Sequence, residues 1–125
     1  MSTKSSINIR RFSILALAAL VANVVLFFIG QAAGASYDVN APSVVGIAMV
    51  VGMTIFPLGL GLVIALITTK VLPKALPAVI WIGFIIAIVS TPGGWAASGD
   101  AATGIALGLM HLTTGFAWLW GMKAK

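Results

Sequence analysis

His111 is the residue of this sequence with the clearest capacity for chemistry. It is the only histidine, and Asp38 and Asp100 are the only acidic residues. An imidazole titrates near neutral pH, and it can relay a proton or bind a metal or a haem. A metal site needs three or four ligands, and the chain has neither a cysteine nor a second histidine. We therefore expect no metal and no cofactor, since a bis-histidine haem would need a dimer that brings two copies of His111 together.

Two interpretations of His111 stay open. In the first, it belongs to a proton relay or a ligand site. In the second, a neutral imidazole forms a hydrogen bond with Asn23 or with a helix carbonyl and holds two helices in register. Hydrolysis by a serine would need a base and an orienting acid close to that serine, and the single histidine lies far along the chain from most serines. We predict that the protein is not an enzyme and has no catalytic residues.

These polar residues belong to a strongly apolar chain. Of its 125 residues, 61% are hydrophobic and 7% are charged, whereas soluble domains carry about 25% charged residues. A helix needs about 20 apolar residues to cross a bilayer, and four such spans occur, at about 12–33, 43–69, 75–91 and 101–122. We predict an all-α polytopic membrane protein in which residues 1–125 form a single domain, a bundle of four transmembrane helices. The third span, with 17 residues, has the minimum length for a crossing.

The basic residues predict the orientation in the membrane. They all fall on one side of the four spans, and they are Lys4, Arg10, Arg11, Lys70, Lys74, Lys123 and Lys125. The two aspartates fall in the other two loops, 34–42 and 91–100. Since Lys and Arg in short loops stay in the cytoplasm, we expect a multi-pass protein of the cell membrane with both termini cytoplasmic. The net charge of +5 then reflects topology, and we expect no binding of nucleic acid.

Several polar residues share one depth in the predicted bundle. Asn23 and His111 each lie 12 residues from a basic residue at the inner end, Arg11 and Lys123 respectively, which places both about 18 Å from that edge. The second span reaches nearly the same depth at Pro57, which frees a backbone carbonyl and kinks or loosens the helix. The candidate intramembrane polar site is Asn23, Thr54, Pro57, His111 and Thr114. Alternatively, Pro57 is a packing kink whose free carbonyl is satisfied by Thr54 or by a neighbouring helix.

The fourth span has two stripes that predict a central position in the bundle. Successive residues of a helix are rotated by 100° about its axis. On that basis six residues fall within about 80° of one another and form one polar face: Asp100, Thr103, Leu107, His111, Thr114 and Trp118. Beside it, Gly104, Gly108 and Gly115 form a small-residue stripe that permits close helix packing. Asp100 is either an outer-face carboxylate at the entry to the His111 stripe or an N-cap of the fourth helix.

Turn and aromatic residues complete the pattern at the membrane edges. Residues 91–95, Thr-Pro-Gly-Gly-Trp, predict a turn. Aromatic residues gather at membrane interfaces, so we expect Tyr37 and Trp95 at the outer edge and Trp118 and Trp120 near the inner edge.

The features that carry a resemblance are the four short spans, Thr91-Pro92, Asp100 with Thr103, and Met110-His111-Leu112. In these features the chain resembles a family of unknown function, made of small actinobacterial four-helix integral membrane proteins. The resemblance covers nearly the whole chain. It implies the four-helix architecture and a location in the cell membrane, and it implies no activity.

We therefore predict a non-enzymatic protein that acts through helix–helix contacts in the lipid bilayer, either as an accessory subunit of a larger membrane complex or as a homo-oligomer. The alternative is a small transporter or channel with a mid-membrane site at Asn23, Pro57 and His111. In size the chain is similar to small multidrug exporters, but those carry an acidic residue in the first helix, where this chain has Asn23. A haem or quinone protein would depend on His111 alone.

Overall fold

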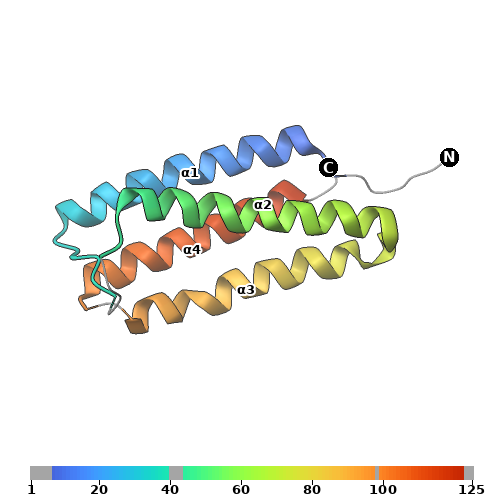
Figure 1. The fold of residues 1–125 in the computed structure, drawn as a ribbon. Helices are drawn as coiled ribbons and strands as arrows, with labels where there is room; N and C mark the ends of the chain where they lie inside the picture. Colours follow the sequence, from blue (N-terminus) through green and yellow to red (C-terminus); the bar gives the residue numbers. More distant parts are fainter. Residues whose placement is uncertain (1–6, 40–43, 98, 123–125) are drawn as a thin grey trace.

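The computed structural model describes residues 7–39, 44–97 and 99–122, with the backbone alone for 92–97. Regular structure in these residues is helical throughout, and the four long helices pack together lengthwise (Figure 1). They are α1 (Ile9–Ala32), α2 (Ile47–Val71), α3 (Leu76–Ala97) and α4 (Ala101–Met122), with a short 3-10 helix, η1 (Pro73–Ala75), before α3. Each long helix contains a segment long and apolar enough to cross a membrane. The predicted fold class, an all-α bundle of four candidate transmembrane helices, is confirmed.

Local signals at both ends explain the bounds of α1. The side chain of Asn8 accepts a hydrogen bond from the backbone N–H of Arg11 at 2.9 Å, so Asn8 caps the helix N-terminus. At the other end Gly34 has a φ of 95°, a conformation that glycine adopts without steric cost. The N–H of Ala35 donates to the carbonyl of Gly30 at 2.8 Å and that of Gly34 to Gln31 at 3.0 Å. This pair of bonds is the Schellman motif that terminates helices.

The helix α3 is longer than the sequence indicated. The prediction of a turn at 91–95 is wrong, because α3 continues through Pro92 to Ala97. A 17-residue helix would measure about 26 Å, shorter than the hydrocarbon core of about 30 Å, and 22 residues reach about 33 Å. Pro92 removes a single backbone hydrogen bond, whereas ending the helix inside hydrocarbon would leave several backbone groups unpaired. Helix continuity therefore outweighs the turn signal.

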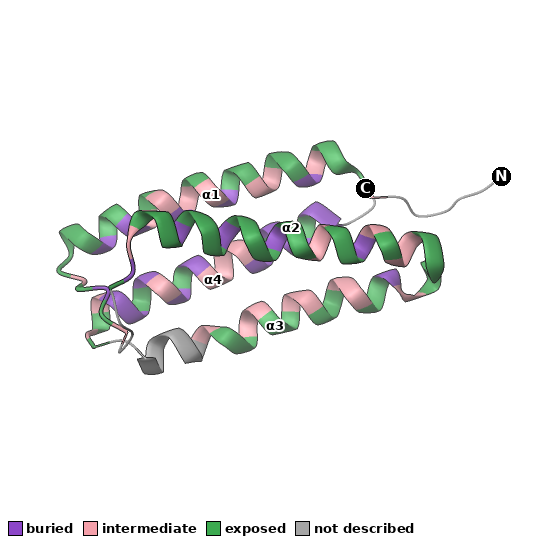
Figure 2. Cartoon of the chain, in the orientation of Figure 1, coloured by how far each residue is buried: buried purple, intermediate pink, exposed green. Residues whose placement is uncertain are grey.

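The central helix of the bundle is α4. It packs most extensively against α3 and α1, whereas α2 contacts it at few points. Within the apolar window of each span, 50% of α4 is buried, compared with 22% of α1, 22% of α2 and 6% of the third span. Buried positions accordingly recur along α4, while α2 and α3 are largely exposed (Figure 2). The prediction that the fourth helix is central is confirmed.

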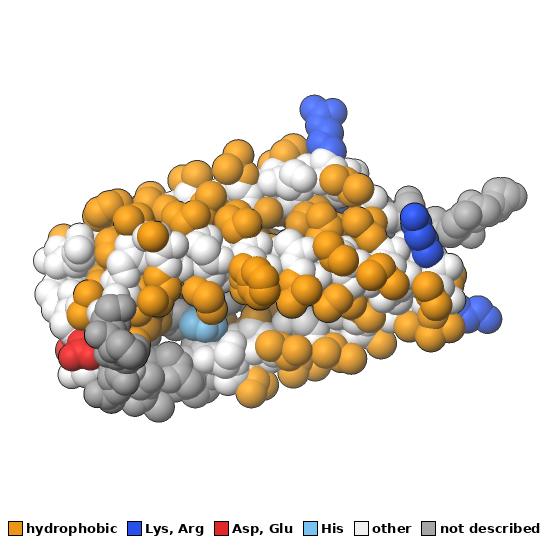
Figure 3. Space-filling view, viewed as in Figure 1, with side chains coloured by type: hydrophobic (Ala, Val, Ile, Leu, Met, Phe, Trp, Pro, Cys, Tyr) orange, Lys and Arg blue, Asp and Glu red, His pale blue; other side chains and the backbone are white. Residues whose placement is uncertain are grey.

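Charge and hydrophobicity are sorted along the bundle axis. In the space-filling view the basic side chains lie at one end and the acidic ones at the other, with apolar side chains over most of the surface between them (Figure 3). The exposed apolar residues include Phe56 and Val89, which are 66% and 68% exposed. An apolar exterior of this extent would be unstable in water and is matched by lipid.

Two apolar clusters form the core, one toward each end. The cluster at the basic end comprises Phe12, Leu58, Ala65, Leu76, Trp118 and Met122. The cluster at the opposite end comprises Phe27, Tyr37, Val45, Val50, Ala106 and Met110. On α1, α2 and α4 the residues between these clusters include polar ones, and this middle layer forms the candidate site.

Candidate functional site

Three polar side chains from three helices meet in the middle layer. The side-chain nitrogen of Asn23 on α1 donates to the hydroxyl of Thr54 on α2 at 2.9 Å and to the hydroxyl of Thr114 on α4 at 3.0 Å. Thr54 donates in turn to the carbonyl of Val50 at 2.8 Å. Asn23 is 1% exposed and Thr54 is 3% exposed. We call Asn23, Thr54 and Thr114 the three-helix polar cluster; its bonds join α1 to both α2 and α4.

One atom of this cluster is unsatisfied. The side-chain oxygen of Asn23 is buried and has no hydrogen-bond partner within the described part of the chain. An acceptor buried without a partner costs about 1–3 kcal/mol. The oxygen is therefore able to accept a hydrogen bond from a water molecule or from a donor group of a small ligand.

His111 does not join the cluster. Its Nδ1 lies 2.7 Å from the carbonyl oxygen of Leu107, one turn earlier on α4. Since a carbonyl only accepts, Nδ1 donates, and in a neutral ring Nε2 then carries the lone pair. The hypothesis of an Asn23–His111 hydrogen bond is wrong, because the Asn23 oxygen is without a partner. The bond from His111 to a helix carbonyl is confirmed, but the carbonyl belongs to α4 itself, so this bond does not hold two helices in register.

Pro57 also lies away from the cluster. The buried residues of α2 are Val50, Thr54, Leu58 and Ala65, and Pro57 is exposed on the outer surface of the helix. Counting residues along the chain predicts the depth of Pro57 but does not assign its side of the helix. Of the five predicted residues, the structure therefore brings together Asn23, Thr54 and Thr114.

A second polar network joins the loop after α1 to the start of α4. Asp100 accepts from the backbone N–H of Thr103 at 2.8 Å, which is the predicted N-cap. Its other oxygen accepts from the hydroxyls of Ser36 and Thr103. These hydrogen bonds, first that of the Ser36 hydroxyl and then that of the Thr103 backbone, lower the pKa of Asp100 to about 2. Asp100 thus serves as a cap and also as an anchor for the loop.

Tyr37 is a core residue in the loop after α1, so it does not face the lipid as a residue of an aromatic belt would, and its depth at the outer edge stays a prediction. It is 2% exposed, and its ring stacks on Phe27 with the centroids 4.6 Å apart. Its hydroxyl donates to the carbonyl of Phe27 at 2.7 Å, and its N–H donates to the hydroxyl of Thr103 at 2.9 Å. Burial, followed by the charge of Asp100, raises the pKa of Tyr37. Gly30 makes room for the ring, since a Cβ there would collide with the tyrosine hydroxyl.

This buried tyrosine has an uncommon backbone conformation. Its φ is 58°, in the left-handed region that costs a non-glycine residue about 1–2 kcal/mol. The hydrogen bonds and ring stacking of Tyr37 offset this cost. The ties from Ser36 and Tyr37 to α4 were not found from the sequence, because neither residue stands in a motif. The side chain of Trp95, the other residue expected at this edge, lies outside the described part of the chain.

Trp118 is a core residue too. It is 6% exposed, and its Nε1 donates to the carbonyl of Ile80 on α3 at 2.8 Å. The ring fits against Gly61 and Gly83, where an added Cβ would collide with it. Trp118 therefore faces the core of the bundle and not the lipid, while its depth near the inner edge stays a prediction. Trp120, in contrast, lies near the basic end of the bundle and is 50% exposed.

Two glycines of the α4 stripe, Gly108 and Gly115, lie against α3. Gly104, Gly108 and Gly115 are all buried. A Cβ added at Gly115 would come within 2.9 Å of the Ala87 Cβ, and one at Gly108 within 3.4 Å of the Thr91 Cγ2. Of these two positions Gly115 is the tighter, and it tolerates no side chain without movement of α3.

The described residues contain no group of three or more side chains suited to hold a metal ion. What the geometry provides is a set of interhelical bonds and one unsatisfied acceptor.

Comparison with known proteins places the chain in a family. No curated protein and no solved structure matches it. A family of unknown function matches residues 3–125, and so the resemblance to a family of unknown function is confirmed. The chain belongs to this family, DUF6069.

Proposed function

We propose that this protein is a non-enzymatic helical bundle of the cell membrane that acts through lateral helix contacts, as an accessory subunit of a larger complex or as a homo-oligomer. The observation that carries the proposal is the set of hydrogen bonds that the polar groups in the helices form. Asn23 bonds to Thr54 and Thr114, His111 to its own helix, and Trp118 to α3. The bonds of Asn23 and Trp118 join different helices, and that of His111 stays within α4. Such bonds support a role for these groups in holding the bundle together.

The exterior of α3 supports a role in lateral contact. Only 6% of the apolar window of this span is buried inside the bundle, and the exposed face carries large side chains: Trp81, Ile82, Ile85, Ile86 and Val89. In a membrane, helices associate by close packing rather than by the hydrophobic effect. A row of large branched and aromatic side chains provides the van der Waals surface for such packing.

We further propose that both termini lie in the cytoplasm. The described basic residues Arg10, Arg11, Lys70 and Lys74 belong to the start of α1 and to the connection between α2 and α3. These two regions occupy one end of the bundle, and Asp38 and Asp100 occupy the other. The positive-inside rule supports a cytoplasmic location for the basic end.

The test is to purify the tagged full-length chain from native membranes in a mild detergent and to measure the mass of the complex by native mass spectrometry. We expect either a stoichiometric second protein or a defined multiple of the chain mass. Replacing Ile82 and Val89 by Ala, on the exposed face of α3, should dissociate the complex, while the same replacement at Ile14 and Leu17 of α1 should leave it intact. A chain that is monomeric without a partner in native membranes would contradict the proposal.

One observation favours a second candidate, a small transporter or channel. The unsatisfied oxygen of Asn23 lies in the middle layer of the bundle, where a passing donor group could bind. This candidate requires flux of a small polar solute or of protons into liposomes that contain the purified chain. The flux must disappear in Asn23→Leu and persist in Thr113→Val, whose hydroxyl bonds only to its own helix.

A further inference from the structure

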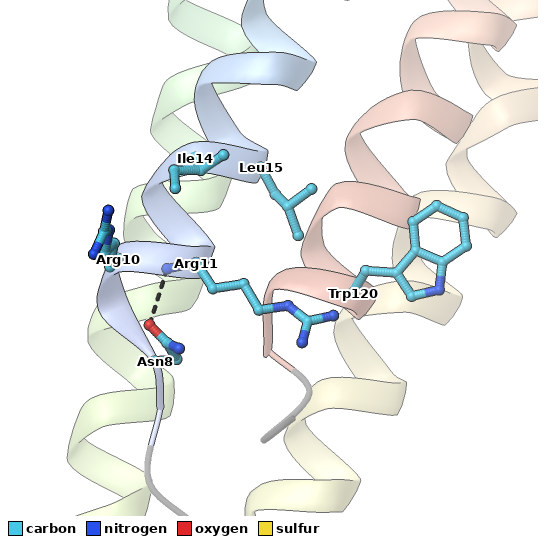
Figure 4. Close-up of a pocket in the computed structure, with 6 residues that line it drawn as sticks. All are labelled: Asn8, Arg10, Arg11, Ile14, Leu15 and Trp120. Carbon is cyan, nitrogen blue, oxygen red and sulfur yellow. Dashed lines mark hydrogen bonds between the residues drawn. The ribbon is translucent and has the colours of Figure 1, made fainter.

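A groove opens at the basic end of the bundle, between the start of α1 and the end of α4. Its volume is about 440 Å³, and it is lined by Asn8, Arg10, Arg11, Ile14, Leu15 and Trp120. In the close-up, Arg11 extends across the groove toward the end of α4, and Trp120 lies on the α4 side (Figure 4). Leu15 points into the space between the two helices, one turn further into the membrane.

The lining changes from cationic to apolar along the bundle axis. Arg10 and Arg11 lie in the first turn of α1, and Ile14 and Leu15 follow one turn later, about 6 Å deeper at 1.5 Å per residue. Ile14 is 58% exposed, so the apolar wall is open to the side of the bundle. A ligand that fits this groove has a negative charge at one end and an apolar chain at the other.

We propose that this groove binds an anionic phospholipid of the surrounding leaflet, with the phosphate at Arg11 and an acyl chain along Ile14, Leu15 and Trp120. Arg10, whose side chain lies on the side of α1 away from α4 (Figure 4), adds positive charge beside the headgroup. The planar guanidinium of arginine donates two parallel hydrogen bonds to phosphate oxygens. Indole rings favour the headgroup region, because one edge is polar and the rest apolar. Basic pockets beside transmembrane helices on the positively charged side recognise acidic headgroups by the same chemistry.

The apolar half of the groove distinguishes a lipid from free phosphate. Inorganic phosphate would contact the arginines and leave Ile14, Leu15 and Trp120 without a partner. A phospholipid satisfies both halves, and the bilayer supplies it from the side on which the groove opens. This site is independent of the lateral contacts proposed for α3, since it lies on α1 and α4.

The experiment uses the purified full-length chain in a neutral detergent. Binding of short-chain phosphatidylglycerol and of the matching phosphatidylcholine is measured by native mass spectrometry. We expect the anionic lipid to bind about 10- to 30-fold more tightly, as two arginines contribute about 1 kcal/mol each. The double variant Arg10→Gln, Arg11→Gln should lose this preference. The matched control Lys70→Gln, Lys74→Gln removes two exposed charges from the same end outside the groove and should retain it.

Two further arms separate the possible outcomes. Trp120→Ala should weaken the binding of both lipids and keep the preference for the anionic one, which also tests the groove if the arginine variant fails to fold. Inorganic phosphate in large excess should not displace the lipid. Equal affinity for the two lipids, equal loss of preference in the lysine control, or displacement by inorganic phosphate would each overturn the proposal.

Discussion

The side-chain nitrogen of Asn23 lies 3.0 Å from the hydroxyl oxygen of Thr114, 91 residues further along the chain. This bond joins the first helix to the last one in the middle of the bundle. On the same nitrogen, Thr54 of α2 accepts a second hydrogen bond. A single amide group therefore links three of the four long helices.

The bond between Asn23 and Thr114 is measurable by a double-mutant cycle. Combining Asn23→Ala with Thr114→Ala should show a coupling of about 0.6 kcal/mol, and at most about 1.7, the range for hydrogen bonds between membrane helices. The measurement is reversible unfolding in mixed micelles. Thr113→Ala is the matched control, because its hydroxyl donates to Leu109 on the same helix, and it should be additive with Asn23→Ala. Additivity of the Asn23 and Thr114 variants would show that the bond contributes nothing.

The carboxylate of Asp100 makes stability depend on pH in the acid range. Its pKa is lowered from 3.8 to about 2 in the folded protein, so the folded state favours the charged form more than the unfolded state does. The stabilisation is fully present above about pH 4 and is lost as the pH falls toward 2. Thermal unfolding in detergent between pH 6 and pH 2 should show this loss. Asp100→Asn should be less stable at pH 6 and should lack that part of the pH dependence, whereas an identical pH profile in this variant would contradict the assignment.

Gly115 should tolerate no side chain. In Gly115→Ala the new Cβ would lie 2.9 Å from the Ala87 Cβ, and overpacking of this kind costs about 1–3 kcal/mol. Gly59→Ala is the control, because a Cβ there meets nothing within 4 Å, and it should be neutral or slightly stabilising. Adding Ala87→Gly to Gly115→Ala should restore much of the lost stability, measured as the midpoint of thermal unfolding. Equal stability of the two alanine variants would show that α3 moves freely away from α4.

The proposed orientation is accessible to cysteine labelling, since the chain has no cysteine of its own. In intact cells an impermeant thiol reagent should modify Ala33→Cys, which is exposed in the loop after α1. It should leave Ser2→Cys unmodified until the cells are opened. The reverse pattern would place the basic end outside the cytoplasm.

Whether a helix end could be predicted from the sequence depended on whether the local sequence signal was stronger than the constraint from the membrane and the rest of the bundle. The Asp100 cap and the start of the fourth helix at 101 were predicted, because an N-cap acts within one turn. The end of α3 was not, since Pro92 and the glycines after it are common in turns of soluble proteins. In the membrane-spanning bundle, the need to pair backbone groups over the full thickness of the hydrocarbon outweighed that signal.

Depth and direction were predictable to different degrees. Counting residues from the charged ends predicted a common depth for Asn23, His111 and Pro57, and Asn23 forms one cluster with Thr54 and Thr114. His111 and Pro57 satisfied the same count and lie outside it. Residue number along a helix gives height directly, whereas the direction of a side chain depends on the rotation of the whole helix, which packing decides.

The sequence by itself therefore determined the class of protein, the four spans, the separation of charges between two ends and the central place of α4. These follow from apolar length, charge and small-residue content, each of which is a property of one segment. Only the tertiary structure decided which polar groups meet and which aromatic rings are buried. Tyr37 and Trp118 were expected at the interfaces, and both are core residues. Gly30 of α1 leaves space for the Tyr37 ring, and Gly61 of α2 and Gly83 of α3 leave space for the Trp118 ring. Such a fit is a property of two or more segments together, so no single stretch of sequence contains it.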